Sequence, residues 1–172
     1  MNGIEIETER KFLIQMPDAE LLDELGGDEI IQTYLEDKRE KGCSRVRSRR
    51  HGDVITYTFT EKQRISDISA HENERRISEE EYSALLEKRE EGTETIRKKR
   101  YVLPYRGYDF EIDVYDFWHA SAIMEVELPG EDAEFELPPG INIIREVSHE
   151  RKFSNHSLAR HVIPEEELSA KE

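Results

Sequence analysis

The stretch from Ile4 to Ile14, IEIETERKFLI, decides the fold of this chain. Charged and apolar residues alternate along it, so the side chains divide between the two faces of a β-strand. One face carries Glu5, Glu7, Glu9 and Lys11, and the other carries Ile4, Ile6, Thr8, Arg10 and Phe12. Such a strand separates an apolar layer from a polar space.

The same alternation marks seven later segments, so the sequence predicts an α+β fold built on a mainly antiparallel sheet of eight strands. Short helices are expected after Pro17, after Ser78 and over 154–161. A further short acidic helix is expected between Gly130 and Pro138. The seven strands are expected at 30–36, 44–50, 54–62, 70–77, 95–103, 108–116 and 122–128.

Charges are sorted by sign among these strands. Acidic residues recur two positions apart on some strands, and basic residues do so on others. For one strand alone, a solvated charged face is the simpler interpretation. For the set, the sorting favours two opposed charged linings inside a closed sheet. The acidic pairs are Glu7 and Glu9, Glu72 and Glu74, Glu111 and Asp113, and Glu125 and Glu127, and the basic run is Arg45, Arg47 and Arg49.

A lining of this kind selects its ligand. Charges inside a closed sheet persist only when they are paired, hydrated or bound to a metal or ligand, because burying an isolated charge costs several kcal/mol. Carboxylates bind Mg²⁺ or Mn²⁺ through oxygen, and Arg and Lys bind phosphoryl oxygens. The pattern therefore predicts a cavity for a metal-bound polyphosphate.

Length and composition narrow the class of protein. The 172 residues fit one domain of roughly 100–200 residues, expected over 1–164 and followed by a polar, frayed tail at 165–172. The formal net charge of -15 argues against a general nucleic-acid-binding protein, which needs a basic face. No apolar run approaches the ~20 residues of a membrane span, so no membrane partner is expected. Cys43 has no partner for an internal disulfide, which fits a reducing, cytoplasmic location.

Eight short motifs occur in order through nearly the whole chain, and together they resemble the CYTH superfamily, also called triphosphate tunnel metalloenzymes. Within it the chain is similar to the short bacterial inorganic triphosphatases. The resemblance implies a closed antiparallel tunnel of eight strands. The motifs are Glu7-Thr8-Glu9-Arg10-Lys11, Gln32-Thr33-Tyr34-Leu35, Arg45 with Arg47, Thr60-Glu61-Lys62, Glu72-Asn73-Glu74, Lys98-Lys99-Arg100-Tyr101, Glu111-Ile112-Asp113-Val114-Tyr115 and Glu125-Val126-Glu127.

The resemblance also implies roles for particular residues. Lys11 and Tyr34 would activate or orient the attacking water. The cofactor would be Mg²⁺ or Mn²⁺, with metal or water-positioning roles for Glu7, Glu9, Glu72, Glu74, Asp113, Glu125 and Glu127. The phosphates would be held by Arg45, Arg47, Lys62, Lys98, Arg100 and Lys152.

Two of these assignments depart from a clear pattern. Arg45, Arg47 and Arg49 lie on the same face of their expected strand, so spacing does not say which two reach the phosphates. Lys152 stands where the family motif has an arginine, and lysine lacks the two-pronged hydrogen bonding of a guanidinium. His149, His156 and His161 are not spaced as a helical metal-binding pair, so no ligand role is expected of them.

The leading hypothesis is a metal-dependent triphosphatase that hydrolyses inorganic triphosphate or a related short polyphosphate. Its partner would then be a small-molecule triphosphate. A class IV adenylyl cyclase-like conversion of ATP to cyclic AMP is the alternative, and a non-catalytic polyphosphate- or nucleotide-binding module is a third. The sequence leaves the oligomeric state open and allows a homodimer.

Overall fold

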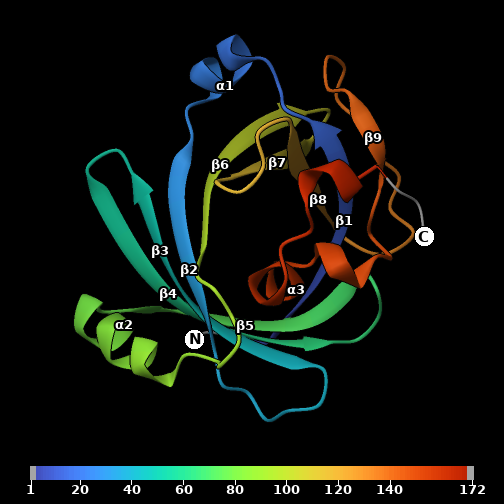
Figure 1. The fold of residues 1–172 in the computed structure, drawn as a ribbon. Coiled ribbons are helices and arrows are strands. Elements are labelled where there is room, and N and C mark those ends of the chain that lie inside the picture. Colours follow the sequence, from blue (N-terminus) through green and yellow to red (C-terminus); the bar gives the residue numbers. More distant parts are fainter. Residues whose placement is uncertain (1–2, 170–172) are drawn as a thin grey trace.

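Eight antiparallel strands form a closed barrel in this computed structural model, which describes residues 3–169 (Figure 1). The barrel closes where β1 pairs with β5, from Glu5 opposite Glu72 to Thr8 opposite Ser69. The predicted α+β fold with an eight-stranded tunnel is confirmed. The strands are β1 (Glu5–Gln15), β2 (Asp28–Leu35), β3 (Gly42–His51), β4 (Val54–Arg64), β5 (Ser69–Ile77), β6 (Ile96–Tyr105), β7 (Tyr108–Tyr115) and β8 (Ser121–Leu128).

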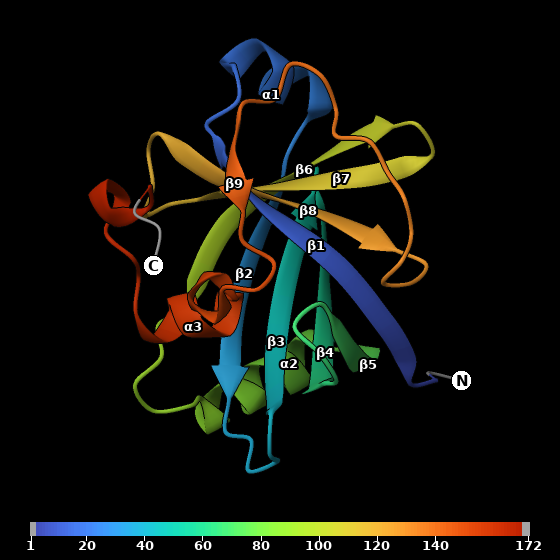
Figure 2. The same ribbon diagram turned by 90° about the vertical axis from the view of Figure 1, so that its right-hand side faces the viewer.

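A ninth strand, β9 (Ile143–Glu146), was not expected from the sequence. It pairs with β1 at Phe12, Leu13 and Ile14, on the edge of β1 that β5 leaves free (Figure 2). Its four residues are too few to show a clear alternation. β9 therefore completes the pairing of β1 beyond the point where the barrel closes.

The apolar faces of the strands point out of the barrel and are covered there. On β1, β7 and β8, outward residues such as Phe12 and Phe110 pack against Phe135 and Ile141 from the segment after β8. On the opposite side, α2 (Glu79–Leu85) and the short helix η1 (Leu86–Lys88) cover the outer face of β3 and β4 (Figures 1 and 2). Because these two clusters lie outside, polar side chains can line the barrel interior, while inward residues such as Leu13 and Ile123 form a third cluster with the C-terminal segment.

The C-terminal segment fills one end of the barrel. It comprises η2 (Arg151–Phe153), α3 (Asn155–Arg160) and η3 (Glu165–Glu167). Phe153 and Leu158 are fully buried against inward-facing Tyr34 and Tyr115. Tyr115 also donates a hydrogen bond of 2.5 Å from its hydroxyl to Asn155 Oδ1. One mouth of the tunnel is therefore partly plugged.

The expected helices are confirmed except for one. The helix after Pro17 is α1 (Ala19–Leu25), the helix after Ser78 is α2, and the helix expected over 154–161 is α3. The acidic helix expected between Gly130 and Pro138 is absent, since residues 133–138 form an irregular segment. Phe135 packs against Phe12 and Phe110 there, and this tertiary packing outweighs the local helical pattern.

The described part of the expected tail is ordered rather than frayed. Leu168 is buried, and Glu165 accepts hydrogen bonds from the backbone of His119 and Ala120. The overall polar composition of the tail did not indicate that one apolar side chain and one carboxylate would hold it in place. Residues 170–172 of the expected tail lie outside the described residues. Within 3–169, no helix is long and apolar enough to cross a membrane.

Candidate active site

A basic wall lines the tunnel on β2, β3 and β4. Directly opposed residues of antiparallel strands point to the same face, so the register places these side chains together. Arg45 lies opposite Tyr34 on one side and Thr60 on the other. Lys62 follows Thr60 on the same face of β4 and lies opposite Glu72 of β5. The predicted phosphate ligands Arg45 and Lys62 therefore face the interior together with Tyr34.

An acidic wall stands where β1 meets β8. Glu9 lies opposite Glu127, and Lys11 lies opposite Glu125. The Nζ of Lys11 is 3.2 Å from Glu125 Oε1 and 3.9 Å from Glu9 Oε1. This wall therefore gathers carboxylates around one lysine.

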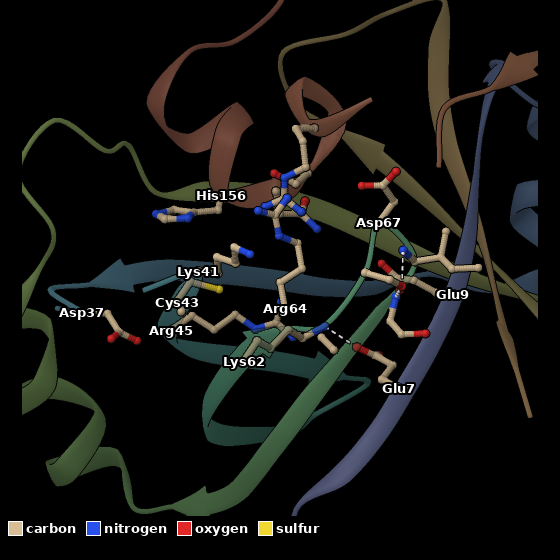
Figure 3. Close-up of a pocket in the computed structure, with 18 of the residues that line it drawn as sticks. Glu7, Glu9, Asp37, Lys41, Cys43, Arg45, Lys62, Arg64, Asp67 and His156 are labelled. Carbon is tan, nitrogen blue, oxygen red and sulfur yellow. Dashed lines mark hydrogen bonds and ion pairs between the residues drawn. The ribbon is translucent and has the colours of Figure 1, made fainter. Parts of the chain in front are cut away.

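The two walls meet at Lys62. Its Nζ is 2.5 Å from Glu7 Oε2 (Figure 3) and 2.9 Å from Glu72 Oε2. Burial alone would lower the pKa of Lys62, but the attraction of Glu9, Glu7 and Glu72 outweighs burial and repulsion by Arg45, and the net pKa is raised. Lys62 is therefore held as a cation inside the barrel.

Deeper in the barrel, a network of ion pairs surrounds Asp113. Lys98 Nζ donates to Asp113 Oδ2 at 2.6 Å, and Arg100 forms two hydrogen bonds of 2.8 Å to the same carboxylate. Arg100 Nη1 also lies 2.7 Å from Glu111 Oε2. Both cations are buried, so burial lowers the pKa of Lys98 to about 7 in spite of Asp113. The structure thus unites the predicted metal ligand Asp113 with the predicted phosphate ligands Lys98 and Arg100.

A cavity of about 410 Å³ opens at the partly plugged mouth (Figure 3). It lies between β1, the ends of β3 and β4, the loop 65–68 and the C-terminal segment. Six residues predicted from the sequence line it: Glu7, Glu9, Lys11, Tyr34, Arg45 and Lys62. The proposed water-orienting pair therefore shares one cavity with carboxylates and phosphate-binding cations.

Arg45 has unused hydrogen-bonding capacity in this cavity. Only 9% of Arg45 is exposed, and its Nε–H has no hydrogen-bond partner among the described residues. A buried donor of this kind costs free energy until an acceptor reaches it. A phosphoryl oxygen would supply that acceptor.

Repulsion between carboxylates marks where a cation fits. Burial, together with Glu125 and Glu7, raises the pKa of Glu9 to about 7 despite Lys11 and Lys62. Burial and three nearby glutamates also raise the pKa of Glu127. Oxygen ligands that repel one another suit a hard divalent cation.

No three His, Cys, Asp or Glu residues among 3–169 converge into a ready-made metal site. This arrangement is compatible with Mg²⁺, which binds through one or two carboxylates and completes its shell with water and substrate phosphate. The residues present therefore fit a metal that arrives with its phosphate ligand.

Other predicted residues are engaged outside the cavity. Arg47 donates two hydrogen bonds to Gln32 Oε1, at 2.9 and 3.2 Å, and Glu74 accepts one of 2.8 Å from Thr60. Arg49 is paired with Asp28 at 2.7 Å. Of the three arginines with one parity, Arg45 alone lines the cavity, and Arg47 lies one step deeper on the same face.

Lys152 does not line the cavity, whereas its neighbour Arg151 does. Lys152 Nζ lies 3.8 Å from Glu150 Oε1 and 5.7 Å from the centre of the Phe153 ring. Its assignment as a phosphate ligand stays a prediction from the resemblance.

Sequence reasoning missed the residues that form the mouth. Most are charged residues in loops or short helices, where no strand alternation indicates direction, or at the end of a strand that extends past its expected bound. They are Asp37, Arg39, Lys41, Arg64, Asp67, Arg151 and Arg160. His156 also lines the mouth; it stacks on Tyr34 with ring centres 4.7 Å apart, and its Nε2 is 2.6 Å from Glu90. Its position four residues after Lys152, a predicted phosphate ligand, was the signal that could have placed it near the site.

The sequence model of the CYTH domain matches residues 5–162. This chain belongs to the CYTH domain family. The match confirms the resemblance inferred from the eight motifs and spans the whole barrel. No curated protein matches the chain.

Solved structures share this CYTH fold. One, described as the inorganic triphosphatase NE1496, is 29% identical, with a TM-score of 0.58 and coverage of 92% of this chain and 96% of the other. Another, described as the hypothetical protein NE1496, is 30% identical, with a TM-score of 0.57 and coverage of 92% and 99%. The PH1819 protein from Pyrococcus horikoshii OT3, at 18% identity, TM-score 0.53 and coverage of 73% and 80%, shares the fold alone.

Proposed function

We propose that this CYTH protein hydrolyses inorganic triphosphate or a short polyphosphate in its tunnel, with Mg²⁺ or Mn²⁺ as cofactor. The observation that carries the proposal is that Arg45 and Lys62 line the same cavity as the carboxylates of Glu7 and Glu9. The description of NE1496 as an inorganic triphosphatase supports it.

The chemistry of phosphoryl transfer matches this cavity. Such transfer needs in-line positioning and neutralisation of charge on the phosphoryl oxygens more than it needs covalent catalysis. A bound divalent metal would neutralise that charge and polarise the phosphoryl group, held by Glu7 and Glu9 with the other predicted carboxylates. Arg45 and Lys62 would fix the substrate, Arg45 through the donor that now has no partner.

Lys11 and Tyr34 are proposed to orient the attacking water. Burial favours the neutral amine of Lys11, but Glu125 and Glu9 outweigh it and raise the pKa of Lys11. Burial raises the pKa of the Tyr34 hydroxyl. Both groups are therefore protonated at neutral pH in the metal-free protein, and they act there as hydrogen-bond donors at fixed positions.

Phosphate release from tripolyphosphate tests the proposal. The purified protein is assayed with Mg²⁺ and with Mn²⁺ over several pH values, beside an Arg45→Ala variant, because Arg45 lines the cavity and has a buried donor without a partner among the described residues. We expect release by the wild type and a loss of about 100-fold or more in the variant, the scale of removing one transition-state donor. No release above the variant under any condition would refute the proposal.

The cyclase alternative requires a place for adenine beside the phosphates. Tyr34 and His156 are the aromatic residues in the described lining of the cavity, and they stack on each other. No specific observation favours this alternative or a non-catalytic binding module, so neither is proposed. The cytoplasmic location and the homodimer stay predictions.

A further inference from the structure

Cations continue along the tunnel wall beyond the cavity floor to the mouth. Arg47 and Arg45 occupy successive inward positions of β3, and Lys62 and Arg64 occupy successive inward positions of β4. Arg64 ends β4 and is tied to Lys41 by a backbone hydrogen bond of 3.1 Å. Figure 3 shows Arg45, Lys62 and Arg64 next to one another along one side of the cavity.

This row of cations is longer than a triphosphate. Within the cavity, Arg45 lies opposite Thr60, four residues before Arg64 on β4, and four residues of a strand rise about 13 Å. A linear triphosphate has four P–O bonds between its first and third phosphorus atoms and spans less than half of that length. A triphosphate seated at Arg45 and Lys62 therefore leaves the outer cations without phosphate.

The outer cations form no close ion pair with any described residue, although Asp67 at the same mouth attracts Arg64 and Arg151 from a longer distance. Among the described residues, Lys41, Arg64 and Arg151 line the cavity and have no ion pair. Two other basic residues at the same mouth are paired, Arg39 with Asp37 and Arg160 with Glu90. In a chain with 40 acidic and 25 basic residues, a cluster left unpaired at a cavity indicates an anionic ligand.

Arg64 and Arg151 approach this mouth from opposite sides, one from β4 and one from η2. Both residues line the cavity. Burial and repulsion by Arg64 lower the pKa of Arg151, and the attraction of Asp67 offsets only part of this effect. An anion between them would remove that repulsion, and each guanidinium can bind a phosphate through two N–H groups.

We propose that Arg64 and Arg151 bind the outer phosphates of a linear polyphosphate longer than triphosphate. The inference rests on the proposed function and specifies its substrate class: chains of four or more phosphates reach the mouth, whereas tripolyphosphate does not. The protein then prefers tetrapolyphosphate over tripolyphosphate.

Calorimetric binding of tripolyphosphate and tetrapolyphosphate to the metal-free protein tests the inference without turnover. We expect tetrapolyphosphate to bind about tenfold more tightly, the effect of one added charge-assisted contact. Arg64→Gln and Arg151→Gln, on separate elements, should each reduce this ratio severalfold. Arg106→Gln removes one positive charge at Glu136, outside the cavity, and should keep the wild-type ratio.

The outcomes separate the two claims. A ratio near one in the wild type, or one unchanged in both mouth variants that fold normally by circular dichroism, overturns the inference. A ratio that behaves as expected in a protein that releases no phosphate supports the inference and refutes the proposed hydrolysis. Failure to bind either anion, with and without Mg²⁺, overturns both.

Discussion

Glu9 shows how the barrel interior sets the state of a single residue. Its carboxylate lies between Lys11 and Lys62 and near Glu7 and Glu125. Burial and the two glutamates prevail over the lysines, so the pKa of Glu9 rises from 4.5 to about 7. Above neutral pH, the metal-free protein therefore carries a negative charge on Glu9 that destabilises the fold.

This charge predicts a stability that depends on pH. Between pH 4.5 and 7 the folded protein binds a proton at Glu9 that the unfolded chain has lost, so the free energy of unfolding falls as pH rises. The fall is at most about 3 kcal/mol, and the 29% exposure of the Glu9 side chain reduces it through solvent screening. Glu9→Gln should flatten this dependence in urea denaturation of the metal-free protein.

Glu5→Gln is the matched control, because Glu5 has the same parity on β1 and is exposed. It should leave the wild-type pH dependence in place. If Glu9→Gln retains the full dependence between pH 4.5 and 7, the interior repulsion assigned to Glu9 is wrong.

Residue positions could be predicted where a strand carries them. Alternation on β3 and β4 correctly turned Arg45 and Lys62 inward. Strand alternation does not apply to the C-terminal segment, where Arg151 lines the cavity and Lys152 does not. Successive side chains in the 3₁₀ turn of η2 point about 120° apart. A shift of one residue in the alignment of the motif therefore changes which side chain is expected to reach the mouth.

At the scale of elements, the C-terminal segment shapes the site. Phe153 and Leu158 fill the barrel end beside Tyr34, while Arg151 and His156 line the cavity from the same segment. Helix α3 was predictable because its N-terminal serine and apolar spacing are local signals. Its docking into the barrel was not, since that depends on inward apolar residues from several distant strands.

Leu158→Ala should destabilise the protein by about 2–5 kcal/mol, because it leaves a cavity where the side chain is fully buried. Urea denaturation followed by circular dichroism measures the change. Val162→Ala removes a side chain that is 37% exposed and should change stability by no more than about 0.5 kcal/mol. Equal effects of the two substitutions would mean that the segment does not pack into the barrel end.

At the scale of the whole molecule, the charge is divided between outside and inside. The chain has a formal net charge of -15, yet Arg45, Lys62, Lys98 and Arg100 are gathered within the barrel. This is possible because α2 and the segment after β8 cover the apolar faces on the outside. An acidic protein can thereby hold a polyanion in a local basic environment.

The measurement that tests this account most directly is a ³¹P NMR time course of tripolyphosphate with Mg²⁺ and the wild-type protein. Hydrolysis of one phosphoanhydride bond predicts that the tripolyphosphate resonances decline while pyrophosphate and orthophosphate appear in equal amounts. Resonances that stay unchanged, in a preparation whose folding is verified by circular dichroism, would contradict it.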